Sequence, residues 1–119
     1  MRVIRTEVTV ATELTVLAVP DCPNASVLQR RLAGLVAGRP DVTVTRRDIT
    51  DLAEAARWGM HGSPTLLIDG RDPFAVPGTT PAVACRLYPD ENGRRDGAPA
   101  VSALRQVLEQ AGARLNAAE

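Results

Sequence analysis

The sequence is poor in aromatic residues, with one Trp, one Tyr and one Phe among 119 residues. Sites for single-stranded nucleic acid stack bases on several aromatic side chains, so this class of function is not expected. Charge of one sign is also missing, because fourteen basic residues, all of them arginine, balance fourteen acidic ones. Such a chain lacks the broad positive field that attracts a nucleic-acid backbone or an anionic membrane surface. We therefore expect neither nucleic acid nor membrane as a partner.

Long apolar runs are absent as well, and none approaches the roughly 20 residues of a membrane-spanning helix. The N-terminal segment MRVIRTEVTVATELTVLAVP is interrupted by charged residues and lacks the continuous apolar region of a secretion signal. These features predict a cytoplasmic protein. Cysteine is scarce too: Cys22 and Cys85 are too few for a disulfide scaffold, and in a reducing compartment such thiols are reactive or simply buried.

The residues that are present suffice for a single domain. The chain is 45% hydrophobic, which supports one core built from Val, Leu, Ile and Ala. We expect an N-terminal extension or edge strand over residues 1–12 and one domain over 13–119. Alternating and helical spacing of apolar residues predicts strands and helices in the order β-α-β-α-β-β-α, with strands at 13–19, 41–49, 64–70 and 82–88 and helices starting near 23, 51 and 99.

This order predicts an α/β fold with a central, mixed four-stranded sheet flanked by helices. Short helices between the early strands indicate parallel neighbours there. The last two strands, 64–70 and 82–88, are expected to form an antiparallel pair at the edge of the sheet. Residues 1–12 could add one further strand.

The motif DCPNA, which follows the first expected strand, places Cys22 at the start of a helix. A thiol there faces unpaired backbone N–H groups and the positive end of the helix dipole, and both favour thiolate over thiol. Pro23 suits the first helical turn, since its missing N–H is not needed there. The adjacent carboxylate of Asp21 opposes this effect. The alternative interpretation is a small, partly buried cysteine with no chemical role.

Together with the order of elements, DCPNA and GMHGSPTLLIDG resemble the thioredoxin superfamily from Leu14 to Leu108. More narrowly, GSPTLLIDGRDPFA and CRLYPDENG resemble a group of small bacterial thioredoxin-like proteins. The resemblance implies a cis Ser63–Pro64 bond facing Cys22, and a substrate-binding site formed by Pro23, Ser63, Pro64 and Thr65. It also implies that the backbone beside Pro64 is free of the sheet and pairs with an extended peptide or a glutathione-like ligand.

The sequence departs from this family at Ala25, which stands where the second cysteine of a C-x-x-C motif would be. Dithiol exchange within the motif is therefore excluded. A low-molecular-weight thiol such as glutathione or mycothiol could instead clear a mixed disulfide on Cys22, so the expected partner is a disulfide-containing protein or a small thiol. Cys85 is a candidate resolving thiol, although its position in AVACRLY favours a core cysteine on one face with Val83 and Leu87. A third route is a sulfenic acid formed on Cys22 by peroxide.

Two other classes of function stay open. The chain could be a non-catalytic thioredoxin-like binding module, or it could capture a soft metal such as mercury or copper with its thiols. The cysteines lack the close spacing of a zinc site, so we assign no metal ligands and no bound cofactor.

The segment between the last two expected strands, residues 70–82, is rich in Pro and Gly and could be a functional loop with Phe74 as an apolar contact, or a rigid tether. His61 could act as a base, but a surface-loop histidine without a role is the favoured interpretation. Trp58 and Met60 are expected to pack against the second helix.

Overall fold

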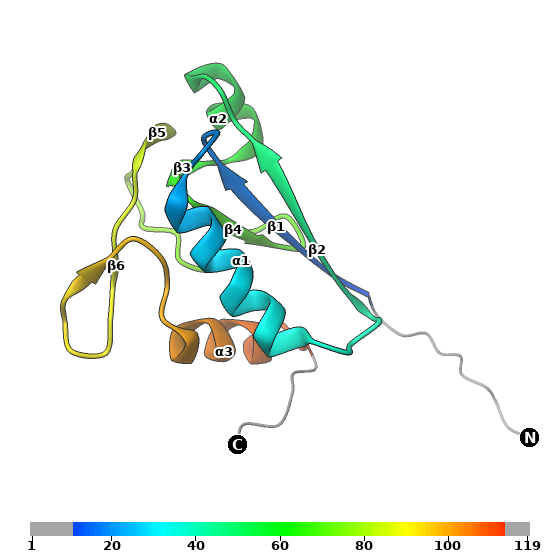
Figure 1. Cartoon of the computed structure of the whole chain (residues 1–119). Coiled ribbons are helices and arrows are strands. Elements are labelled where there is room, and N and C mark those ends of the chain that lie inside the picture. The colour runs from blue at the N-terminus through cyan, green and yellow to red at the C-terminus, as the bar shows by residue number, and fades with distance from the viewer. Residues whose placement is uncertain (1–10, 114–119) are drawn as a thin grey trace, which may run out of the picture.

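The computed structural model describes residues 11–113, which form a mixed α/β fold. The sheet has three strands in the order β2-β1-β4. The central strand β1 (Thr12–Ala18) is parallel to β2 (Val42–Asp48) and antiparallel to β4 (Thr65–Ile68). The helices are α1 (Pro23–Val36), α2 (Leu52–Trp58) and α3 (Val101–Gln110). Figure 1 shows α1 and α3 lying close together, with α2 at the opposite end of the fold.

Alternating side chains of β1 divide the core between the two faces of the sheet. Leu14, Val16 and Ala18 are fully buried in a cluster with apolar residues of α1 and α3. Leu17 points to the other face and joins a smaller cluster that includes Met60 and residues of α2. The period of two in a strand therefore accounts for helices on both sides of the sheet. The segments at the ends of β1 and β4 carry the residues of the candidate site described below.

Several expected elements are confirmed to within a residue or two. The strands expected at 13–19 and 41–49 are β1 and β2, and the first helix begins at Pro23 as predicted. The N-terminus of α2 is capped as its sequence suggests, because the Asp51 side chain accepts a hydrogen bond from the Glu54 N–H at 2.8 Å. The carboxylate of Glu54 accepts in return from the N–H of Thr50.

The prediction of a four-stranded sheet with a late antiparallel hairpin is wrong. The strand β5 (Ala82–Cys85) pairs in parallel with β3 (His61–Ser63), and this pair is separate from the three-stranded sheet. Pro64 lies between β3 and β4 and has no N–H to continue the ladder, so the two strands take different partners. The long connection after β4 then allows β5 to run parallel to β3 rather than fold straight back.

The expected extension is largely untested, and the expected strand 82–88 is shorter than predicted. The first strand begins at Thr12, one residue inside the expected extension 1–12, and residues 1–10 lie outside the part that the structure describes. The expected strand 82–88 ends at Cys85, and the chain continues into a two-stranded hairpin of β6 (Tyr88–Pro89) and β7 (Arg95–Asp96). Within residues 11–113 no helix is long and apolar enough to cross a membrane.

Candidate thiol site

Cys22 is the N-cap residue of α1, directly before Pro23. Its backbone N–H donates to the carbonyl of Val19 at 3.3 Å, which closes the turn between β1 and the helix. The residue is 8% exposed and packs at the edge of the larger core cluster. Ala25, one turn into the helix, is fully buried. The thiol therefore sits at a helix start, as the motif predicts, but with only a small accessible area.

The second motif lies beside the first, and Val19 is the point of contact. The Ser63–Pro64 peptide bond is cis, and the Ser63 hydroxyl accepts a hydrogen bond from the Val19 N–H at 3.0 Å. Val19 thus holds Cys22 through its carbonyl and Ser63 through its N–H. Two segments more than forty residues apart in the sequence meet at this residue.

The backbone around Pro64 is already hydrogen-bonded within the chain. The Ser63 carbonyl accepts from the N–H of Arg86 at 3.0 Å, and the Pro64 carbonyl accepts from the hydroxyl of Tyr88. Thr65 pairs with Leu17 of β1. The expectation that this backbone is free for an extended ligand is therefore wrong for the structure described here, because β5 and the residues after it occupy that edge.

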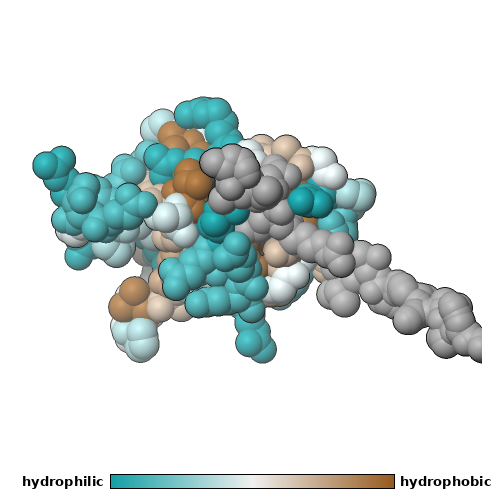
Figure 2. Space-filling model, turned by 90° about the horizontal axis from the view of Figure 1, so that it is seen from below, coloured by the Kyte–Doolittle hydropathy of each residue, from teal (hydrophilic) through white to brown (hydrophobic). Residues whose placement is uncertain are grey.

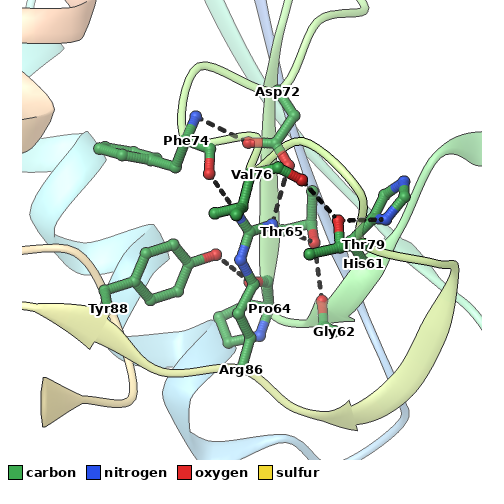
Figure 3. A network of polar contacts seen from close by, with 10 residues as sticks. All are labelled: His61, Gly62, Pro64, Thr65, Asp72, Phe74, Val76, Thr79, Arg86 and Tyr88. Carbon is green, nitrogen blue, oxygen red and sulfur yellow. Dashed lines mark hydrogen bonds and ion pairs between the residues drawn. The ribbon is translucent and has the colours of Figure 1, made fainter.

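Arg86 organises this region, and sequence reasoning missed it (Figure 3). Its guanidinium donates to the Asp72 carboxylate at 2.8 Å, to the Thr65 hydroxyl at 3.1 Å and to the Phe74 carbonyl at 2.7 Å. The Arg86 and Asp72 side chains are only 10% and 9% exposed, so their charges are well shielded from solvent. The Thr65 hydroxyl donates onward to the Gly62 carbonyl at 2.7 Å. Arg86 therefore links the loop after β4 to the segment around Pro64.

Gly62 is required for this close approach. Its φ of +112° is one that L side chains rarely adopt, and a Cβ there would lie 2.7 Å from Cβ of Arg86. In the loop expected at 70–82, Phe74 is half-buried against the core and its carbonyl accepts from Arg86, while residues 75–80 are exposed. A sequence signal for Arg86 did exist, since it is a charged residue within an otherwise apolar segment, but nothing in the sequence identified Asp72 as its partner.

Tyr88 closes the other side of Pro64 and is 3% exposed. Its ring meets Phe74 edge-on at 5.6 Å between centroids, and the Arg86 guanidinium lies 4.7 Å from its ring centre. Burial raises the pKa of Tyr88 strongly, and the negative charge of Asp72 adds to this, while Arg86 acts in the opposite direction.

Tyr88 is the only tyrosine in the chain, so its ionisation can be followed directly by ultraviolet absorbance. We expect no tyrosinate signal at pH values just above 10, where a free tyrosine ionises. Because the folded-state pKa is raised, the stabilisation from the neutral phenol is complete below about pH 10 and is lost as pH rises beyond it. Tyrosinate should therefore appear together with unfolding, as measured by circular dichroism. Ionisation of the native protein near pH 10 would contradict this.

The other residues singled out in the sequence are spread around this site. Cys85 is exposed and is the register partner of Ser63, so its interpretation as a core cysteine is wrong. His61 belongs to β3 rather than to a loop, and its Nδ1 lies 3.1 Å from the Thr79 hydroxyl. Met60 is fully buried beside α2, as expected. Trp58 is 37% exposed and stacks under the guanidinium of Arg47 at 4.0 Å.

A pocket of about 440 Å³ lies between the turn after β4 and the C-terminal end of α3, and Asp72, the partner of Arg86, is among the residues that line it. Neither cysteine lines this pocket. Among residues 11–113, no three His, Cys, Asp or Glu side chains come together as metal ligands. The face in Figure 2 is largely hydrophilic with separate hydrophobic patches. The cysteine and cis-proline segments are therefore the best-defined candidate site in this part of the chain.

Comparison with protein-family models, curated proteins and solved structures gives no match for this chain. The class of protein that the structure defines is a mixed α/β domain with a cysteine at a helix N-cap beside a cis-proline segment. A narrower assignment of function therefore depends on the contacts and the chemistry of these residues.

Proposed function

We propose that the chain is a thioredoxin-like thiol-disulfide exchange protein that acts through a single cysteine, Cys22. The observation that carries this proposal is the hydrogen bond between Val19 N–H and the Ser63 hydroxyl, which brings the cis Ser63–Pro64 segment to the turn that bears Cys22. Cys22 lies at the N-terminus of α1, and the thiolate is the form of cysteine that attacks disulfides. Pro23, Ser63, Pro64 and Thr65 would form the surroundings of the reacting sulfur.

In the proposed reaction, the Cys22 thiolate attacks one sulfur of a substrate disulfide. A Cys22–substrate disulfide forms, and the other substrate sulfur leaves as a thiolate that takes a proton from water. Ala25 cannot clear this intermediate. A second thiol, from glutathione or mycothiol, attacks it, which restores Cys22 and leaves the small thiol disulfide-bonded to the substrate. Such thiols are abundant in a reducing cytoplasm, where we place the protein.

Cys85 is the alternative resolving thiol. It is exposed, and it lies in register with Ser63, whose hydroxyl reaches Val19 in the turn that leads to Cys22. Attack by Cys85 on the intermediate would release the substrate as a thiol and leave a Cys22–Cys85 disulfide for an external reductant.

A second candidate function is a non-catalytic binding module, and the burial of Cys22 favours it. Cys22 as a residue is only 8% exposed, which disfavours attack on a large disulfide. Capture of a soft metal is supported less well, because the two cysteines stand on different elements, α1 and β5, and no third ligand joins either of them within residues 11–113.

The experiment that separates exchange from binding compares the two cysteines within one chain. The protein is mixed with glutathione disulfide at neutral pH, and the adduct on each cysteine is followed with time by peptide mass spectrometry. Cys85 is the internal control, because it is an exposed thiol on a strand. We expect the adduct on Cys22 to form at least about tenfold faster than on Cys85, in spite of its burial, and to be removed by excess glutathione. Slower reaction at Cys22 than at Cys85 would favour the binding module.

A further inference from the structure

We propose that β5 is an internal occupant of the edge on which extended disulfide substrates dock, and that such substrates reach Cys22 by displacing it. This inference rests on the proposed exchange at Cys22 and identifies its substrate class as a disulfide in an extended peptide segment. A strand edge beside the reacting cysteine offers main-chain N–H and C=O groups to such a segment. In this protein, β5 of the same chain pairs with the main-chain groups of β3.

The position of β5 supports this occupancy. It runs parallel to β3, with Ala82 N–H donating to the Met60 carbonyl and Arg86 N–H donating to the Ser63 carbonyl, both at 3.0 Å. The same Ser63 contacts the turn of Cys22 through its hydroxyl. A chain paired with β3 therefore leads toward the turn that holds the reacting thiol.

The hold of β5 on this edge is light. Its sequence is AVAC, so its side chains are small, and Ala84 and Cys85 are exposed. The pairing is also irregular, since the register shifts between His61 and Ser63. Val83 alone of its side chains packs against the cluster that contains Met60, so most of the resistance to opening comes from the contacts of Arg86 that follow the strand. An extended peptide can make the same main-chain bonds.

The anchor of β5 is the residue that follows it. Arg86 is fixed by Asp72, by the Thr65 hydroxyl and by the Phe74 carbonyl, as Figure 3 shows. These contacts join β5 to the loop after β4. The ion pair between Arg86 and Asp72 therefore controls how readily β5 separates from β3.

The test uses hydrogen exchange on the full chain with Cys85→Ser, a change at an exposed position that leaves Cys22 as the only thiol. One sample carries on Cys22 a short extended peptide with a single cysteine, loaded from its thionitrobenzoate mixed disulfide. The matched control carries glutathione, loaded in the same way. We expect the amides of Ala82 and Arg86 to exchange at least about tenfold faster with the peptide attached than with glutathione.

Equal protection of β5 in the two adducts would overturn the inference and leave exchange at Cys22 intact. Faster exchange in β4 rather than β5 would also overturn it, since the peptide would then use another edge. If Cys22 accepts neither adduct, the proposed function fails and the inference fails with it. Asp72→Asn gives an independent measurement. Weakening the ion pair with Arg86 should raise the loading rate of the peptide about tenfold relative to that of glutathione. An unchanged ratio would show that the ion pair does not hold β5.

Discussion

Replacing Cys22 by serine is expected to reduce disulfide exchange to about a tenth of the wild-type rate or less, because a hydroxyl is a far weaker nucleophile than a thiolate toward sulfur and the remaining thiol, Cys85, reacts more slowly. The measurement is glutathione-dependent reduction of a peptide disulfide, followed by release of a chromophoric thiol. Ala25 occupies the position of a second thiol in the motif, so any activity that remains should come from Cys85.

The matched control is Cys85→Ser. If an external thiol clears the intermediate, this variant should keep its rate within about twofold, because surface substitutions of this kind leave the fold almost unchanged. A large loss in Cys85→Ser would instead identify Cys85 as the resolving thiol. Full activity in Cys22→Ser would remove Cys22 from the mechanism. Thermal unfolding of both variants should accompany the assay, because Cys22 is buried at the edge of the core and serine places a hydroxyl there.

The local parts of this site could be read from the sequence, and the long-range parts could not. Cys22 and Pro23 lie at a helix start because a strand, a turn and an apolar helical pattern follow one another along the chain. The position of the cis Ser63–Pro64 bond beside the turn of Cys22 was expected only through the resemblance, since it joins distant segments, and the contact of Val19 with Ser63 was not predicted. Periodicity predicts which residues face a core, but it does not say which strand will be the neighbour of another.

The prediction of a four-stranded sheet was wrong for the same reason, because the sequence pattern does not identify which strands pair. Residues 82–85 have the apolar character of a strand, and adjacent strands in sequence often pair. Their pairing with β3 instead depends on Gly62, which permits the close approach, and on Arg86, which needs a buried carboxylate. That carboxylate belongs to Asp72 in a loop, fourteen residues away. Such a pairing of charges is decided by tertiary packing and leaves no regular pattern in the sequence.

The Arg86–Asp72 pair leads to the largest expected change in stability. Asp72→Asn keeps the shape of the side chain but leaves the guanidinium without a counter-charge at a site where both partners are about nine-tenths buried. Removing one partner of a buried pair typically costs about 3–5 kcal/mol, and we expect a decrease of about 3 kcal/mol in the free energy of unfolding, measured by urea denaturation. Arg86→Gln should cost at least as much, because it also removes the bonds to Thr65 and Phe74.

The chain contains a control of the same residue types in the exposed pair of Arg46 and Asp48, which are 3.0 Å apart with side chains 24% and 52% exposed. Asp48→Asn should lower the free energy of unfolding by less than about 1 kcal/mol, since solvent screens such pairs. The double variant Asp72→Asn with Arg86→Gln should be more stable than the sum of the single effects predicts, because the second change removes the uncompensated charge left by the first. Strict additivity, or equal losses in Asp72→Asn and Asp48→Asn, would mean that the buried pair does not hold the loop and β5 against the segment around Pro64.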